Sequence, residues 1–280
     1  MNMCPKICYL FEIILYQLYI MIKIIHQIWF DLGNGKNIPD KYKLYQSSWI
    51  KHHPKWKYIL WDEQMGTSLI KQHYNKYYDM YINVKYPIMK IDILRYCILH
   101  KYGGLYADID YKCLNNFDSY IEYNSNKNIF INNTPKSIYD YFGKTVSNSL
   151  LISRYEKDIF WILVLDECKK RIETYKELYY IWYVVATTGP ILLNDVLSNV
   201  KNNNIHILPH EQFNMCNDCK KCYPSKTNKL YAVHDYASYW NDKYWLNIRK
   251  CITCLSYVDI LIVIIIFYIV YRLCYSKFRS

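Results

Sequence analysis

Residues 92–110 read DILRYCILHKYGGLYADID, and they indicate a helix, a glycine turn and a buried strand in succession. A helix is expected over 87–101, because a proline opens it, apolar residues recur at helical spacing and a Gly-Gly pair follows its end. The apolar run 105–109 then predicts a buried strand. This strand carries two acidic residues at its end, Asp108 and Asp110.

Short apolar runs and helical segments alternate on both sides of this stretch. Further strands are expected at 23–30, 57–61, 129–132, 150–153 and 230–233, and further helices at 42–51, 158–178 and 190–200. Strands that alternate with helices predict a mixed α/β fold with a largely parallel central sheet. We find no internal repeat or linker, so one domain with appendages is the simpler organisation.

The composition excludes a disordered chain and gives no evidence for nucleic-acid binding. Of the 280 residues, 52% are hydrophobic and 18% aromatic, far more than a disordered chain contains. Lys and Arg number 35 against 24 Asp and Glu, a net charge of +11. Most of this charge is carried by scattered lysines without a basic run, which favours a solvated surface, and we predict no nucleic-acid partner.

One segment near the C-terminus has the length and apolarity of a membrane span. Twelve consecutive residues, 260–271, are apolar, and the candidate transmembrane helix covers 255–275. The alternative is a buried core helix. A weaker apolar stretch leads the chain at 1–20, as a leading segment or a weak signal anchor, and the main domain is expected at 21–250. A single-pass membrane protein of the secretory pathway (Golgi- or ER-like), or of an equivalent host membrane, is predicted.

The eleven cysteines leave at least one unpaired if the others form disulfides. Five of them lie close together in two groups with CxxC spacing: Cys216, Cys219, Cys222, Cys251 and Cys254. Zinc sites use such spacings, but local disulfides or free thiols fit equally well. The alternatives stay open.

The two acidic residues at the end of the central strand suggest a cation site. In an extended segment, residues i and i+2 point to the same side, so Asp108 and Asp110 can face one point. Two close carboxylates repel each other unless a cation lies between them or one takes a proton. Oxygen ligands suit Mg²⁺ or Mn²⁺, which also bind phosphates. A bare Asp-x-Asp is common, however, and two solvent-facing acids are the alternative.

A second pair of charges precedes this strand. Asp92 and Arg95 are three residues apart on one helix face, where they could form only a surface ion pair of little energetic value. Placed one helix before an Asp-x-Asp strand, they suggest instead an acid that binds a sugar and a guanidinium that binds phosphate.

Ordered blocks of sequence give these residues a context. They are IIHQIW at 24–29, the segment 49–62 with its tryptophans near both ends, the segment 86–110, TGP at 188–190 and HDYASYW at 234–240. In this order they resemble the DXD-type glycosyltransferases, a family that includes the yeast initiating α-1,6-mannosyltransferase and the catalytic subunit of inositol-phosphoceramide mannosyltransferase.

The resemblance implies the type A glycosyltransferase fold, a Rossmann-like mixed sheet flanked by helices that binds a nucleotide sugar. It implies a retaining transfer of a hexose, with mannose favoured, from a nucleotide-sugar donor to a glycan or glycolipid acceptor, with Mn²⁺ or Mg²⁺ as cofactor. In the last block Asp235 and Tyr239 replace the family's second His and its Ser. This departure motivates the alternative of a catalytically degenerate, membrane-anchored protein that binds sugar nucleotides.

The resemblance also assigns roles to single residues. The implied donor-binding residues are Gln27, Trp29, Asp92, Arg95, Asp108 and Trp240, of which Arg95 and Asp108 are also catalytic, together with Asp110. The implied metal ligands are Asp108, Asp110, His234 and Ser238. Asn148 is expected on the acceptor side.

Overall fold

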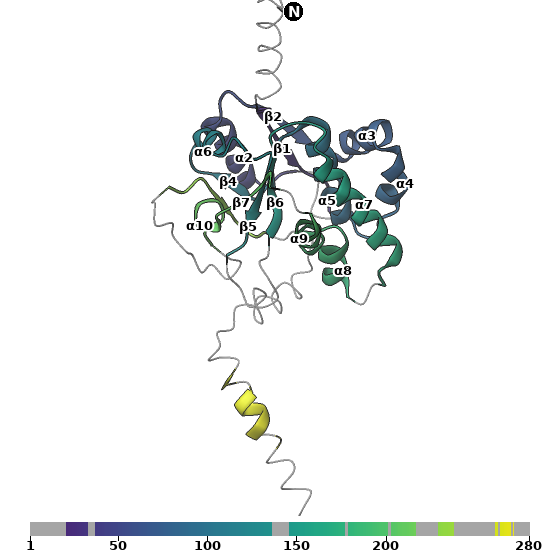
Figure 1. Cartoon of the computed structure of the whole chain (residues 1–280). Helices are drawn as coiled ribbons and strands as arrows, with labels where there is room; N and C mark the ends of the chain where they lie inside the picture. Colours follow the sequence, from purple (N-terminus) through teal and green to yellow (C-terminus); the bar gives the residue numbers. More distant parts are fainter. Residues whose placement is uncertain are drawn as a thin grey trace, which may run out of the picture.

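The computed structural model describes most of the predicted main domain and a short helical stretch near the C-terminus (Figure 1). The described residues are 21–32, 37–135, 146–176, 179–200, 203–216, 229–237, 261–262, 264–269 and 271. The predicted leading segment at 1–20 lies outside them, and so do Ser238, Tyr239 and Trp240.

A six-stranded sheet forms the centre of the fold, with strand order β2-β1-β3-β6-β5-β7 (Figure 1). Its strands are β1 (Ile24–Ile28), β2 (Lys57–Trp61), β3 (Gly104–Ala107), β5 (Ile129–Asn133), β6 (Val146–Ser153) and β7 (Ile205–Leu208). The pairs β1–β2, β1–β3 and β5–β7 are parallel, whereas β6 runs antiparallel to both β3 and β5.

The α/β prediction is therefore confirmed, and so is the largely parallel sheet: of these six strands, β6 alone runs against the others. Antiparallel neighbours need no crossover helix, so β6 can follow β5 directly in the chain and pair beside it. A buried apolar run does not reveal strand direction, because strands covered on both faces look alike in sequence.

Helices cover both faces of the sheet (Figure 1). One face carries α3 (Glu63–His73), α4 (Asn75–Asn83), α5 (Pro87–Tyr102), α7 (Ile159–Thr174) and α9 (Pro190–Asn199), with α8 (Tyr180–Thr187) packed on α7 and α9. The other face carries α2 (Asp40–His52), α6 (Asp118–Tyr123), α10 (His210–Phe213) and a two-stranded sheet of β4 (Tyr111–Cys113) and β8 (Ala232–His234).

Alternation along the strands divides the core between these two faces. Leu151 of β6 packs in the cluster under α5 and α7, while its neighbours Leu150 and Ile152 pack in the cluster under α2 and α6. Likewise Tyr106 of β3 and its neighbour Leu105 face opposite sides. The strands are thus buried on both faces, which is why they appear in the sequence as nearly continuous apolar runs.

The Gly-Gly pair ends α5 as predicted, for a reason that the backbone makes clear. Gly103 and Gly104 both have positive φ, +59° and +84°, where side chains are disfavoured. A Cβ on Gly104 would lie 2.4 Å from the carbonyl oxygen of Ile24. Glycine therefore allows the chain to turn from α5 into β3 and to pair closely with β1.

The two acidic residues of the central stretch lie in a turn and not on an extended strand, which corrects the predicted geometry. β3 ends at Ala107, and the backbone N–H of Tyr111 donates to the carbonyl oxygen of Asp108 at 3.0 Å. This hydrogen bond closes a turn over 108–111. Asp108 and Asp110 converge because the chain folds back into β4, and not through the two-residue period of a strand.

None of the helices in the described part of the chain has the length and apolarity needed to cross a membrane. The described residues between 261 and 271 are helical, while the rest of the predicted span at 255–275 lies outside the described residues. The predicted transmembrane helix therefore finds no support in the described residues.

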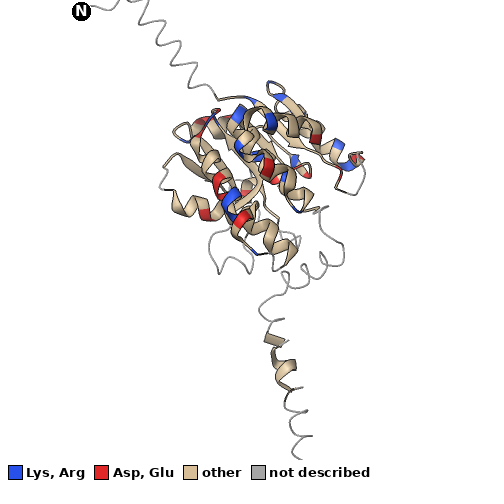
Figure 2. Ribbon diagram, turned by 90° about the vertical axis from the view of Figure 1, so that its right-hand side faces the viewer, with Lys and Arg blue, Asp and Glu red and all other residues tan. Residues whose placement is uncertain are grey.

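Figure 2 shows Lys and Arg interspersed with Asp and Glu along the ribbon of the domain. Several lysines pair with nearby acids, as Lys90 does with Glu63 at 2.9 Å and Lys23 with Asp118 at 3.2 Å. Mixed signs of this kind are typical of a solvated protein surface.

Candidate functional site

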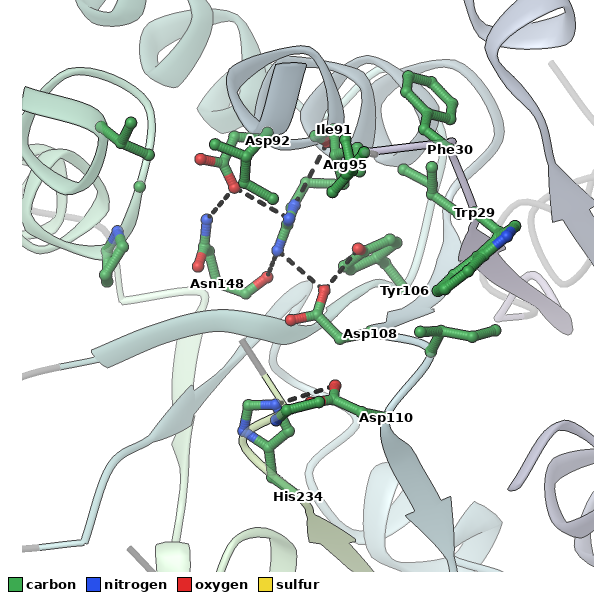
Figure 3. Close-up of a pocket in the computed structure, with 18 of the residues that line it drawn as sticks. Trp29, Phe30, Ile91, Asp92, Arg95, Tyr106, Asp108, Asp110, Asn148 and His234 are labelled. Carbon is green, nitrogen blue, oxygen red and sulfur yellow. Dashed lines mark hydrogen bonds and ion pairs between the residues drawn. The ribbon is translucent and has the colours of Figure 1, made fainter. Parts of the chain in front are cut away.

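A pocket opens beside the ends of β1 and β3, where the sequence placed its candidate residues (Figure 3). The carboxyl ends of parallel strands are where open α/β sheets bind ligands. The pocket is lined by residues from β1 and the segment after it, α5, β3 and the following turn, β6, α8, the start of α9, and β8. Among them are Trp29, Phe30, Asp92, Arg95, Tyr106, Asp108, Asp110, Asn148 and His234.

Three of the predicted metal ligands meet at one side of this pocket. One ligand atom each of Asp108, Asp110 and His234 lies within 4.8 Å of the others. β8 brings the histidine there, because His234 pairs directly with Tyr111 in the small sheet and their rings stack at 4.6 Å. The His234 Nε2 lies 3.1 Å from Asp110 Oδ1, and the backbone N–H of Ala237 donates to Asp110 Oδ2 at 2.8 Å.

The two carboxylates differ in their electrostatic environment. Burial raises the pKa of Asp108, and the Asp110 carboxylate adds to the rise, against the opposing effect of Arg95. Burial would also raise the pKa of Asp110, but the His234 imidazole outweighs it and the pKa is lowered. For His234, burial lowers the pKa, and the Asp110 carboxylate more than reverses this, so the pKa is raised. Asp110 and His234 thus each favour the charged form of the other, beside Asp108.

This group of side chains fits a divalent cation. Two carboxylates and an imidazole are donors that Mn²⁺ accepts, and carboxylates also suit Mg²⁺. The Nδ1 atom of His234 is buried without a hydrogen-bond partner among the described residues. The protein thus leaves one nitrogen of this imidazole without a partner, and such a buried polar atom calls for an explanation.

Arg95 is the cationic centre of the pocket, and its contacts exclude the alternative of a surface ion pair. The side chain is 3% exposed. One guanidinium nitrogen, Nη1, donates to Asp108 Oδ1 at 3.1 Å and to the carbonyl oxygen of Asn148 at 2.7 Å. The other, Nη2, lies 2.9 Å from Asp92 Oδ1, and the guanidinium is 4.7 Å from the ring centre of Tyr106. The charge is therefore held in one place (Figure 3).

Asp92 lines the pocket, and protein donors occupy both of its oxygens. Asn148 Nδ2 donates to Oδ1 and Thr188 Oγ1 to Oδ2, each at 2.9 Å. Burial raises the pKa of Asp92 to about 6, although Arg95 acts in the opposite direction. The residue thus ties α5 to β6 and to the loop before α9. Asn148, expected on the acceptor side, lines the same pocket and belongs to this network.

The sequence reasoning assigned no role to Tyr106 or Thr188. The hydroxyl of Tyr106 donates to Asp108 Oδ1 at 2.6 Å, while its ring covers Arg95. Its spacing of two residues from Asp108 along β3 was the available signal. Thr188 stands in the Thr-Gly-Pro block, but its hydrogen bond to Asp92 depends on a contact across 96 residues that no local pattern shows.

Two of the predicted donor-binding residues, Gln27 and Trp29, differ in their position relative to the pocket. Trp29 lines the pocket, whereas Gln27 is fully buried beneath it and is not among the lining residues. Gln27 Nε2 donates to the carbonyl oxygen of Asp108 at 3.0 Å, and Gln27 Oε1 accepts from the hydroxyl of Tyr58 at 2.7 Å. Both amide atoms of Gln27 are thus engaged within the protein.

The last sequence block is only partly described. Asp235, which stands at the family's second histidine, is bound by Lys41 Nζ and by the hydroxyl of Tyr42, both on α2. This acid thus anchors the segment after β8 to α2. Ser238 and Trp240 lie outside the described residues, so their predicted roles stay predictions.

Little of the cysteine-rich segment is described. Cys216 is disulfide-bonded, so it has no thiolate to offer a zinc ion. The other four cysteines of the two groups lie outside the described residues: Cys219, Cys222, Cys251 and Cys254. The free cysteines of the described part are all buried: Cys97, Cys113 and Cys168.

Comparison with known proteins agrees with the resemblance read from the sequence. Residues 39–127 match the family described as "Glycosyltransferase sugar-binding region containing DXD motif". This region contains Asp92, Arg95, Asp108 and Asp110. The resemblance is confirmed.

The chain is also similar to curated yeast proteins. Mannosyl phosphorylinositol ceramide synthase SUR1 of Saccharomyces cerevisiae is 30% identical over 64% of this chain and 42% of the relative. The synthase CSH1 of the same yeast is 29% identical over 70% of this chain and 49% of the relative. The chain thus spans about half the length of these relatives or less. Among solved structures, the PaToxG glycosyltransferase aligns with a TM-score of 0.47 and 16% identity, over 69% of this chain and 77% of that one.

Proposed function

We propose that this protein is a metal-dependent, retaining glycosyltransferase with the type A fold. Its match to the sugar-binding region of the DXD glycosyltransferases supports the proposal. The enzyme would move a hexose from a nucleotide sugar to a glycan or glycolipid acceptor. One observation carries the proposal: Asp108, Asp110 and His234 converge in one pocket, beside the buried guanidinium of Arg95.

The residues of the pocket act by positioning and by charge. Arg95 places a fixed positive charge where the negative charge of a leaving diphosphate would develop. Tyr106 and Arg95 both contact Oδ1 of Asp108 and thus fix the orientation of its carboxylate. Such preorganised groups need no rearrangement during the reaction, and holding donor and acceptor together supplies much of the remaining rate.

The metal would be held by Asp108, Asp110 and His234. When bound, a divalent cation neutralises the diphosphate of the donor and makes it a better leaving group. The neighbouring His234 imidazole lowers the pKa of Asp110 and so keeps its carboxylate ionised, and His234 would be neutral when it binds the cation. This leaves an anionic oxygen ready for a cation at neutral pH.

Mannose is the sugar that we favour, because the names of the similar yeast proteins specify mannosyl transfer to an inositol-phosphoceramide lipid. Attachment to a membrane, in the secretory pathway or in an equivalent host membrane, remains a further prediction from the sequence.

The test is hydrolysis of a panel of nucleotide sugars by the full chain in Mn²⁺. The panel contains GDP-mannose, UDP-glucose, UDP-galactose and UDP-N-acetylglucosamine, with and without a chelator. Turnover of one donor that is lost with the chelator and in Asp110→Asn would support the proposal and name the sugar. Asp166→Asn, an acid of α7 bound by Lys76 and Tyr77 and absent from the pocket lining, is the matched control and should keep full turnover.

The alternative is a protein that binds sugar nucleotides without turnover, motivated by Asp235. It predicts binding of a nucleotide sugar to the folded protein but no hydrolysis of any donor and no transfer in an acceptor screen. That combination would contradict the proposed enzyme and favour the degenerate protein.

A further inference from the structure

A chain of hydrogen bonds runs sideways through the fold to the turn that carries the two aspartates. Gln46 Nε2 on α2 donates to the hydroxyl of Tyr58 on β2 at 2.9 Å. That hydroxyl donates to Gln27 Oε1 on β1 at 2.7 Å, and Gln27 Nε2 donates to the carbonyl oxygen of Asp108 at 3.0 Å. The chain thus crosses the neighbouring strands β2 and β1 and ends just after β3.

The direction of the hydrogen bonds is fixed by the last acceptor, the carbonyl oxygen of Asp108. The carbonyl oxygen of Asp108 can only accept, so the amide of Gln27 must present its nitrogen there and its oxygen to Tyr58. The Tyr58 hydroxyl must then donate to Gln27 and accept from Gln46. All the donors point toward the turn, an arrangement in which successive hydrogen bonds polarise one another. Gln27 is fully buried, so water cannot replace a lost partner without a structural change.

The receiving carbonyl belongs to the turn on which the metal site depends. The same oxygen of Asp108 accepts the hydrogen bond from Tyr111 N that closes the turn, and Asp108 N donates to the carbonyl oxygen of Ser149 at 2.8 Å. The main chain of Asp108 is therefore held from three sides, by β1, β6 and its own turn. Of these three contacts, the one from β1 is made by a side chain, that of Gln27.

We propose that Gln27 and Tyr58 are positioning residues for the metal site: their relay holds the main chain of Asp108 so that its carboxylate meets Asp110 and His234. The inference rests on the proposed metal site and goes beyond it, since neither residue lines the pocket. It assigns to Gln27 a structural task beneath the site in place of contact with the donor.

Mn²⁺ affinity tests the relay without any need for turnover. Loss of a group that orients a metal ligand commonly weakens binding by about 10–100-fold, and we expect about tenfold for Gln27→Met. Tyr58→Phe removes only the hydroxyl and should weaken binding several-fold. In the Gln27→Met background, Tyr58→Phe should have no further effect, because its influence passes through Gln27. Free Mn²⁺ is followed by electron paramagnetic resonance during titration of the full chain.

The matched control is Tyr120→Phe, which also removes a half-buried hydroxyl with a polar partner, His206 Nε2 at 2.9 Å, outside the pocket lining. It should leave Mn²⁺ affinity unchanged even if it lowers the melting temperature as much as Tyr58→Phe does. Equal affinities of the wild type and Tyr58→Phe, or additive losses in the double variant, would overturn the relay. If Gln27→Met does not fold, Tyr58→Phe and its control decide alone. A wild-type chain that binds no Mn²⁺ would overturn the metal site together with the relay.

Discussion

Replacing Arg95 by methionine should reduce the free energy of unfolding by about 3–5 kcal/mol, the usual cost of removing one partner from a buried ion pair. The structure supports a value in this range, because Asp92 is 5% exposed and would lose the cation that lies 2.9 Å away. The carbonyl oxygen of Asn148 would lose a donor at 2.7 Å, and Asp108 would lose its ion pair at 3.1 Å. Methionine keeps most of the side-chain volume, so the loss reports on charge and hydrogen bonds.

Arg171 supplies the matched control. It is similarly buried on α7, with Glu167 at 2.8 Å and Asp195 at 2.9 Å, but these carboxylates are 26% and 45% exposed. Water screens such partners, so Arg171→Met should cost only about 1–2 kcal/mol. It should also leave donor hydrolysis intact, whereas Arg95→Met should abolish it.

The pH dependence of the stability lost in Arg95→Met shows whether the loss comes from the buried carboxylates. The pKa of Asp92 is about 6 in the folded protein, against an ordinary value of 3.8 for an aspartate in an unfolded chain. Because the folded-state pKa is raised, Asp92 contributes stability below pH 3.8 that is lost as the pH rises through 6. Without Arg95 this pKa rises further, and the loss continues to higher pH. Arg95→Met should therefore be less destabilising at pH 5 than at pH 8.

The assay is urea unfolding followed by tryptophan fluorescence, for both variants and the wild type at the two pH values. An Arg95→Met variant that loses no more stability than Arg171→Met at pH 8, or whose loss does not shrink at pH 5, would show that Arg95 does not stabilise the buried carboxylates.

Three further predictions concern single contacts. His26 is fully buried, accepts from Trp61 Nε1 at 3.1 Å and donates to a carbonyl oxygen at 3.0 Å, and burial lowers its pKa to about 3. The unfolded chain therefore takes up a proton at higher pH than the folded protein does, and His26 should cost about 1.4 kcal/mol of stability per pH unit as the pH falls from 6.5 toward 3. Urea unfolding at pH 7 and 5 should show this decrease in stability, and His26→Gln should reduce it. An equal decrease in His26→Gln would contradict the prediction. Tyr106→Phe keeps the ring over Arg95 but removes the hydroxyl at 2.6 Å from Asp108. The kcat/KM for the donor should therefore fall about tenfold, while the free energy of unfolding changes by less than about 1.5 kcal/mol. An unaltered kcat/KM would contradict the role of that hydroxyl. Gly104→Ala should destabilise the fold by more than about 1 kcal/mol in the same unfolding assay, because its φ is +84° and its Cβ would meet a carbonyl oxygen at 2.4 Å; a neutral effect would mean that β1 and β3 can separate freely.

Elements with one strong local pattern were predictable from the sequence. β2 has the predicted bounds 57–61, and α5 begins at the predicted proline and ends within one residue of the prediction. By contrast, α3 was not predicted, although Asp62 caps it by accepting from Met65 N and is an available start signal. The short helix α8 was also missed, because its eight residues form one apolar run without a polar face.

The residues of the site were likewise predictable only where a local pattern or the resemblance pointed to them. Asp108, Asp110 and Arg95 could be found from one contiguous stretch, and His234 from the resemblance alone. The contacts of Gln27 could not be predicted, because they depend on which neighbouring strand and which turn its side chain faces. The two aspartates converge as predicted, but through a turn closed by a hydrogen bond and not through strand alternation. The spacing of the residues in the sequence thus identified the two aspartates, whereas their geometry depends on the fold.

We propose that Asp108, Asp110 and His234 hold a divalent cation through which the pocket binds a diphosphate. Calorimetric titration of the full chain with GDP and with UDP, in Mn²⁺ and in chelator, tests it most directly. We predict that at least one nucleotide binds in Mn²⁺, that chelator abolishes the binding, and that Asp110→Asn abolishes it while Asp166→Asn does not. Equal binding in chelator, or full Mn²⁺-dependent binding by Asp110→Asn, would contradict the claim.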